Sequence, residues 1–236
     1  MKIPKALINL LIAALLFCTG INAQNTPKTD TVKTAQVIVT VVNAKKQPRK
    51  GEQVILQSQK SKKAYIGKTD AAGRATLTLP AGEDYLITLK AFTDSTEYGN
   101  FSIPPLGPAQ YYKDPLTIDI TFEPARTFTL DGLQFDVAKA TIRPSSFPQL
   151  EELLEYLQWK TDTKIEIDGH TDNTGKDADN LLLSQQRSDA VKAWLVKKGI
   201  TADRIIAKGF GATQPVADNS DEDGRQRNRR IELKIL

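Results

Sequence analysis

The 236-residue chain has little of the residue types that build disulfides, metal sites and nucleic-acid interfaces. It contains one cysteine, Cys18, and one histidine, His170. A single cysteine allows no disulfide within the chain, and so few sulfur and nitrogen ligands disfavour a zinc site. Only 7% of the residues are aromatic, and no run of lysine and arginine is interleaved with them. We therefore expect neither a metal site nor a nucleic-acid partner.

The chain also lacks a strong net charge. Its formal charge of +4 includes Lys2 and Lys5, and without these two residues the charge is +2, too close to neutral to indicate a nucleic-acid partner. Gly175 and Gly211 belong to no phosphate-binding pattern, so we expect no cofactor.

One apolar segment stands out at the N-terminus. Two lysines precede an apolar run over residues 7–17, which is too short to cross a bilayer, and the small residue Ala23 follows. This pattern predicts a Sec signal peptide over residues 1–23, and no transmembrane segment in the mature chain. A lipidated Cys18 is the less favoured alternative, because the residue before it is a bulky phenylalanine.

Residues 24–34 are polar and rich in threonine and lysine, as expected of a flexible linker. Residues 35–123 then show short alternating runs separated by turn signals. Strands are expected near residues 36–42, 53–57, 64–67, 75–79, 85–91 and 116–122. Four prolines make residues 100–115 a loop or an extended edge. This spacing predicts an antiparallel β-sandwich.

Turn motifs refine this prediction. The stretch Thr69–Gly73, followed by Leu77–Gly82 and then Tyr85, resembles the transthyretin-like, or carboxypeptidase regulatory-like, sandwich. The resemblance implies that these residues form turns and edges rather than a ligand site. The sandwich would then serve as a spacer, or bind an envelope protein or a glycan.

Residues 125–236 alternate strands with helices. Strands are expected over residues 127–135, 165–170, 204–208 and 229–235, helices over 148–157 and 177–198, and a polar insertion over 218–224. This order predicts a small α/β sandwich with a βαβαββ-type mixed sheet and helices on one face.

The stretch from Ile165 to Arg187 is the most informative part of this region. Its strand is followed by a turn at Asp172-Asn173-Thr174-Gly175, and a helix then begins with Asp177 as the expected N-cap. Arg187 falls in that helix's apolar stripe, where a guanidinium needs an anionic partner. The other members of the predicted stripe are Leu183, Ala190, Val191 and Trp194. Asp172 and Arg187 together could hold a zwitterion, or form a salt bridge with each other.

The same region carries an ordered set of short motifs. They are Phe135-Asp136, the Leu-rich helix at 150–157, Gly169-His170-Thr171-Asp172, Gly175, Leu183–Arg187, Gly209-Phe210-Gly211 with Pro215, and Asn228–Glu232. This set resembles the peptidoglycan-binding domain of outer-membrane protein A and the peptidoglycan-associated lipoproteins.

The resemblance implies that the domain captures diaminopimelate in the peptidoglycan stem peptide. In that picture Asp172 receives the ammonium and Arg187 the carboxylate, with Arg229 and Asp136 as secondary contacts. The chain is thereby expected to be a non-catalytic protein of the periplasm or outer membrane of a diderm bacterium. The alternative is a periplasmic scaffold in which only the β-sandwich binds a partner.

Two other functions, metal binding and nucleophilic catalysis, could involve the residues at the end of the strand expected over residues 165–170. Asp168, His170 and Asp172 alternate as metal ligands do, but Asp168 and His170 are better explained as cross-strand partners of Arg230 and Lys234. A Ser184–His170 pair suits nucleophilic catalysis less well, because Ser184 lies within a helix and not on a strained turn. We therefore expect no enzyme.

Overall fold

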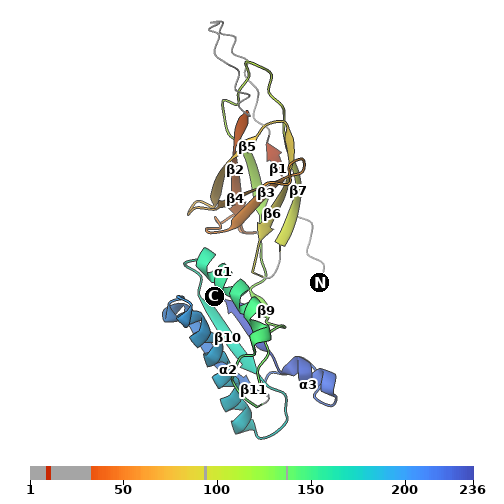
Figure 1. The fold of residues 1–236 in the computed structure, drawn as a ribbon, viewed down its shortest axis with the longest axis vertical. Helices are drawn as coiled ribbons and strands as arrows, with labels where there is room; N and C mark the ends of the chain where they lie inside the picture. The colour runs from red at the N-terminus through yellow and green to blue at the C-terminus, as the bar shows by residue number, and fades with distance from the viewer. Residues whose placement is uncertain (1–8, 12–32, 93–94, 137) are drawn as a thin grey trace. The chain divides into compact units, whose positions relative to one another are not determined.

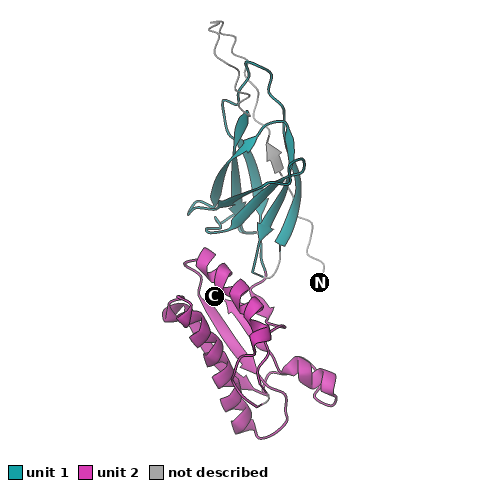
Figure 2. Cartoon of the chain, in the orientation of Figure 1, with its two compact units in different colours: residues 1–124 teal, residues 125–236 magenta. Residues whose placement is uncertain are grey.

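The computed structural model describes residues 9–11, 33–92, 95–136 and 138–236. The chain divides into two compact units, residues 1–124 and 125–236 (Figure 2). Most of the predicted signal peptide, including Cys18, and most of the predicted linker lie outside the described residues. Within the described part, none of the helices combines the length and apolar character needed to cross a bilayer.

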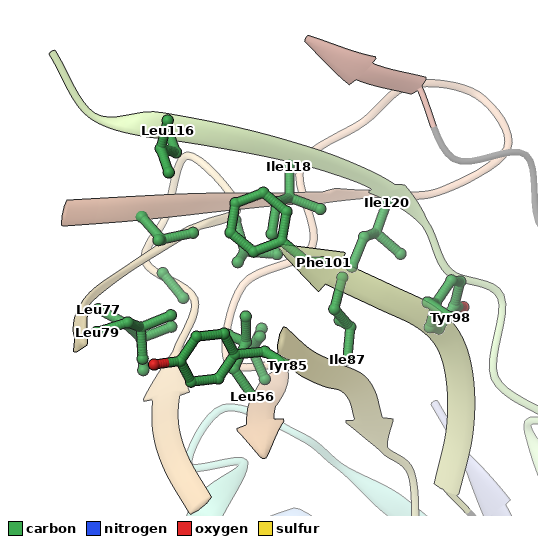
Figure 3. Close-up of a cluster of buried hydrophobic side chains, with 14 of the residues drawn as sticks. Leu56, Leu77, Leu79, Tyr85, Ile87, Tyr98, Phe101, Leu116, Ile118 and Ile120 are labelled. Atoms are coloured by element: carbon green, nitrogen blue, oxygen red, sulfur yellow. The ribbon is translucent and has the colours of Figure 1, made fainter. Parts of the chain in front are cut away.

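The first unit consists of two four-stranded sheets, with strand orders β1-β8-β2-β5 and β4-β3-β6-β7 (Figure 1). The strands are β1 (Asn9–Leu11), β2 (Thr34–Val42), β3 (Gln53–Ser58), β4 (Ala64–Lys68), β5 (Arg74–Pro80), β6 (Glu83–Lys90), β7 (Ser95–Ile103) and β8 (Leu116–Thr121). Alternate side chains of both sheets meet in one hydrophobic core, in which Tyr85 lies close to Leu56 (Figure 3).

The prediction of purely antiparallel pairing is wrong for one pair, because β2 and β8 run parallel. Parallel neighbours need a crossover connection, and here the chain passes twice through the second sheet between them. The segment expected to be a loop or an extended edge begins inside β7, which is the edge strand of its sheet. Its prolines follow Ile103, where the strand ends.

The second unit contains one mixed sheet with the strand order β11-β10-β12-β9. Its elements are β9 (Thr127–Thr129), α1 (Phe147–Trp159), β10 (Ile165–His170), α2 (Asp177–Lys197), β11 (Ile205–Gly211), α3 (Glu222–Asn228) and β12 (Ile231–Ile235), with short 3-10 turns at Pro144–Ser146 and Ala202–Arg204. β10 is parallel to β11 and antiparallel to β12. The mixed α/β architecture predicted for this region is therefore confirmed.

Several predicted boundaries differ from the structure. β9 ends at Thr129 because a turn follows, in which the Leu133 N–H donates to the Leu130 carbonyl at 3.0 Å. The predicted polar insertion ends in helix α3, whose N-cap Asp221 accepts a hydrogen bond from the Gly224 N–H at 2.6 Å. α3 delays the last strand, which begins at Ile231 rather than at residue 229. The N-cap of α2 is Lys176, and Asp177 is its first helical residue.

The buried side of α2 also differs from the predicted stripe. Its centre is formed by small or polar residues and two aliphatic ones, namely Asn180, Ser184, Ser188, Val191 and Leu195. The predicted positions Leu183, Arg187, Ala190 and Trp194 lie half-buried beside them.

Close packing explains this rotation of the helix. A Cβ atom on Gly169 would lie 2.3 Å from the Ser184 carbonyl oxygen, and one on Gly209 would lie 2.3 Å from the Gln185 nitrogen. The helix therefore rests on the bare backbone of β10 and β11, where serine side chains fit and leucine side chains do not. With this packing Arg187 lies beside the buried centre of the helix and is half-buried.

Candidate functional site

The second unit contains a cavity of about 690 Å³ where the ends of several elements meet. All four predicted site residues line it: Asp136, Asp172, Arg187 and Arg229. They come from the segment before α1, the turn after β10, the middle of α2 and the C-cap of α3. The fold thus brings together residues that are far apart in the sequence.

Asp172 is fixed by its own turn. Its Oδ1 accepts the Thr174 N–H at 2.9 Å, and its Oδ2 accepts a hydrogen bond from Arg229 Nη1 at 2.6 Å. The Asn180 side-chain amide ties the turn to α2 by donating to the Asp172 and Thr174 carbonyls. Burial raises the pKa of Asp172, but the hydrogen bonds from Arg229 and Thr174 outweigh burial, so the net pKa is below its usual value. The carboxylate is therefore ionised at neutral pH.

Arg229 is held by three acceptors. Besides Asp172, its guanidinium donates from Nη2 to Glu222 Oε1 at 2.5 Å and makes a short hydrogen bond to the Gln226 side chain. Burial lowers the pKa of Arg229, but the hydrogen bonds to Asp172 and Glu222 raise it above its usual value. Since Glu222 and Gln226 belong to α3, this short helix holds Arg229 on the carboxylate.

Arg187 has a different environment. Its Nε donates to the Lys139 carbonyl at 3.1 Å, and its guanidinium carbon lies 5.1 Å from the centre of the Phe135 ring. Burial and the neighbouring Arg229 lower the pKa of Arg187. In the described part of the chain it forms no ion pair with a carboxylate. The predicted alternative of an Asp172–Arg187 salt bridge is therefore wrong, because Arg229 takes the carboxylate.

Asp136 lies at the rim of the cavity. Its Oδ1 is 3.3 Å from Nε of Arg143, and both side chains are about as exposed as they are buried, at 43% and 44%. Such a solvent-exposed ion pair contributes little to stability. The ion pair with Arg143 therefore holds the Asp136 side chain only weakly.

The polar face of β10 is formed by a cross-strand ion pair and by ring stacking. Asp168 accepts a short hydrogen bond from Lys234, as expected across the strands. His170 instead stacks on Phe210 with ring centres 5.4 Å apart, and its ring makes no hydrogen bond within the described residues. Burial lowers the pKa of His170 to about 4, so its ring is neutral.

The geometry of the described residues fits neither of the two alternative functions, a metal site at the end of β10 or a nucleophilic Ser184. Among the described residues, no three histidine, cysteine, aspartate or glutamate side chains gather at one point. Ser184 is buried, donates to the Leu181 carbonyl and accepts the Gly211 N–H, so its hydroxyl joins α2 to β11.

Two contributors to the cavity were missed from the sequence. The Thr171 hydroxyl is buried, lines the cavity and has no hydrogen-bond partner in the described structure. Glu222 lines the cavity as well and holds Arg229. The signal for α3 was present in Asp221, an N-cap residue followed by acidic residues in the first turn and arginines in the last.

Comparison with known proteins matches residues 134–229 to the OmpA family. This span includes all four predicted site residues. The C-terminal unit belongs to the OmpA family. The resemblance inferred for this unit from its ordered motifs is thus confirmed.

The relatives of this OmpA-family unit include outer membrane porin F of Pseudomonas fluorescens, which is 43% identical over 103 residues. That match covers 44% of this chain and 32% of the porin. The probable lipoprotein YiaD of Escherichia coli is 35% identical, with 44% of this chain and 48% of the lipoprotein covered. The peptidoglycan-binding protein ArfA of Mycobacterium bovis is 35% identical, with 41% and 29% covered. The chain thus spans less than two thirds of each relative.

Among solved structures, the OmpA-family unit matches the peptidoglycan-associated lipoprotein from Burkholderia pseudomallei at 28% identity. The match covers 48% of this chain and 91% of that protein, with a TM-score of 0.41.

Proposed function

We propose that the OmpA-family unit binds peptidoglycan noncovalently through the diaminopimelate of the stem peptide. The observation that carries this proposal is Arg187, a guanidinium in the cavity with no carboxylate partner among the described residues. A cation in this position favours a ligand that brings a carboxylate, because charge-assisted arginine–carboxylate contacts are strong and directional. The peptidoglycan-binding relative supports the same ligand class.

Diaminopimelate offers the matching chemistry at its side-chain centre, which carries one carboxylate and one nitrogen. Arg187 receives the carboxylate in this proposal. Asp172 faces the nitrogen, since a carboxylate has about four lone-pair positions and the donors of Thr174 and Arg229 do not fill all of them. The unpaired Thr171 hydroxyl and the rim residue Asp136 provide further polar contacts.

The protein is proposed to act without catalysis in the periplasm or at the outer membrane of a diderm bacterium. Its first unit then serves as a spacer, or binds an envelope protein or a glycan, as a transthyretin-like sandwich would. Deleting residues 1–124 tests this division of labour. Sedimentation with purified peptidoglycan should persist without the first unit, and its loss would favour the scaffold alternative.

Arg187→Ala is the direct test of the site. We expect sedimentation with peptidoglycan sacculi to weaken at least about tenfold, because a hydrogen bond to a charged group contributes about 1.5–3 kcal/mol. Arg126→Ala removes an exposed arginine outside the cavity and should leave binding unchanged. If both variants sediment like the parent protein, Arg187 does not contribute to peptidoglycan binding.

Calorimetric titration with soluble stem peptides tests the ligand. A diaminopimelate-containing peptide should bind, and a lysine-containing peptide should not, because lysine lacks the side-chain carboxylate. Equal binding of the two peptides would show that the carboxylate is not recognised.

A further inference from the structure

The charge of Asp172 is already compensated within the protein. Its side chain is only 11% exposed, and Arg229 Nη1 lies 2.6 Å from Oδ2. The Thr174 N–H binds the other oxygen. These donors leave at least one of the carboxylate's roughly four lone-pair positions open, but its negative charge no longer needs a cationic partner. A neutral N–H group is therefore as suitable a donor to Asp172 as an ammonium group.

Arg229 is anchored too firmly to leave when a ligand enters. Removing it from Asp172 would also strain its bonds to Glu222 and Gln226, which hold the same guanidinium from α3. Breaking a partly buried ion pair leaves an uncompensated charge, which costs more than the pair itself contributes. The Asp172–Arg229 pair therefore persists in the bound state.

Arg187 presents the opposite situation. It is a half-buried cation in the same cavity, and its only hydrogen bond in the described structure is to a backbone carbonyl. The charge that a ligand must supply is therefore negative. The two predicted receptor residues are not equivalent, because one needs a counter-ion and the other does not.

We propose that the site recognises the diaminopimelate side chain through its carboxylate and accepts the side-chain nitrogen either as a free ammonium or as the amide of a cross-link. Cross-linked stem peptides are then ligands as well as free ones. This inference rests on the proposed function and specifies which form of peptidoglycan the cavity takes.

A second cavity provides space for the stem peptide that is attached through the cross-link. It measures about 440 Å³ and shares Leu133, Gln134, Gln226 and Arg229 with the first cavity. A peptide joined to the nitrogen beside Asp172 would pass Arg229 into this space. There it meets Arg227, an exposed residue with no ion pair among the described residues, which can bind a carboxylate of the second stem.

The test compares three stem peptides in titrations of the full chain. One has the free diaminopimelate side chain, one has its side-chain nitrogen acetylated, and one has its side-chain carboxylate converted to an amide. We expect the acetylated peptide to bind within about threefold of the free peptide, and the amidated peptide to bind at least tenfold more weakly. A tenfold loss on acetylation would overturn the inference and leave the proposed function standing. Failure of the free peptide to bind would overturn both.

The second cavity is tested with Val216→Trp, which places a bulky ring at a position that is 59% exposed and lines the second cavity but not the first. This variant should bind a cross-linked stem dimer at least fivefold more weakly than the parent protein does. Its affinity for the uncross-linked peptide should stay within twofold, which also shows that it folds. Unchanged binding of the dimer would remove the second cavity from the binding path.

Discussion

A strand of the first unit and a strand of the second bury their side chains in different ways. β2 alternates buried residues with exposed or half-buried ones, whereas all six residues of β10 are buried. β2 places Ala35 and three valines in the core, and its other residues, three polar and two apolar, are exposed or half-buried. β10 buries Ile165 and Ile167 on one face, and Glu166, Asp168 and His170 on the other.

This difference shows that the second unit buries ionisable side chains as well as apolar ones. Burying an ionisable side chain is unfavourable unless it is paired and hydrogen-bonded. On β10 the pairing comes from neighbouring strands, since Glu166 bonds Lys208 at 2.7 Å and Asp168 bonds Lys234. Such a strand fixes its own end, and Asp172 follows that end by two residues. The ion pairs that offset the cost of burying these carboxylates therefore also hold the end of β10, and with it Asp172, in place.

The largest expected effect tests the contact that orients α2. In Gly169→Val, the new Cβ would lie 2.3 Å from the backbone oxygen of Ser184, which cannot move without shifting the helix. We expect a loss of about 4 kcal/mol in the free energy of unfolding of the second unit. Both tryptophans, Trp159 and Trp194, belong to this unit, so denaturant titration by tryptophan fluorescence reports on it alone.

Gly175→Ala is the control for this variant. Gly175 has a φ of +94° but no atom within 4 Å of a new Cβ, so only backbone strain of about 1 kcal/mol is expected. Equal losses in the two variants would mean that close packing at Gly169 does not limit stability.

The next effect tests the independence of the first unit. Leu56 is fully buried in its core, and Leu56→Ala should lower the stability of that unit by about 3 kcal/mol. Hydrogen exchange of β3 and β6 should reveal the loss, whereas the tryptophan transition and peptidoglycan binding should not change. Ile66→Ala, at a position that is 54% exposed, is the control and should alter stability by about 0.5 kcal/mol or less. A shifted tryptophan transition in Leu56→Ala would show that the units unfold together.

The polar face of β10 predicts a pH dependence confined to the second unit. Burial, followed by the nearby Arg230, lowers the pKa of His170 to about 4, whereas Glu232 opposes the shift. An unfolded histidine titrates near pH 6.5, so between pH 6.5 and 4 the unfolded chain binds the proton and the folded chain does not. Stability from this group is complete above pH 6.5 and is lost as the pH falls toward 4, by up to about 3 kcal/mol.

Denaturant titrations by tryptophan fluorescence at pH 7.5, 6 and 5 measure this dependence. In His170→Gln no imidazole titrates, so the slope over that range should flatten even if the absolute stability is lower. An unchanged slope would assign the pH dependence to other groups.

The sequence allowed the local parts of the site to be predicted. The alternation of residues 165–170 gave the strand, and Asp172 with Gly175 gave the turn, because both depend on neighbouring residues. Arg187 was placed on a helix that faces the same cavity. Only the alternative of an Asp172–Arg187 salt bridge is wrong, since Asp172 pairs instead with Arg229, which lies 57 positions away in the sequence and is held by the unpredicted α3.

The orientation of α2 was missed for a different reason. A pattern of large apolar residues favoured Leu183 and Trp194 as the core positions. The structure uses Ser184 and Ser188 instead, because glycines on the facing strands let the backbones approach closely. The periodicity of apolar residues does not predict a contact that forms because the facing strands have glycines, which carry no side chain. Glycines in adjacent strands opposite paired helix serines are the signal that would have revealed it.

The smallest expected effect tests whether α3 links fold to binding. Asp221 caps α3, and Asp221→Ala should cost about 1 kcal/mol of local helix stability. Asp223→Ala removes an acidic first-turn residue that makes no capping bond and should cost only a few tenths, about 0.3 kcal/mol. Because α3 carries the residues that hold Arg229, fraying of α3 in Asp221→Ala should weaken peptidoglycan binding by roughly up to fivefold. Binding by Asp223→Ala should not change. If Asp221→Ala loosens α3 in hydrogen exchange while binding stays constant, the Asp172–Arg229 pair does not need α3, and the anchoring of Arg229 would have to come from Asp172 alone.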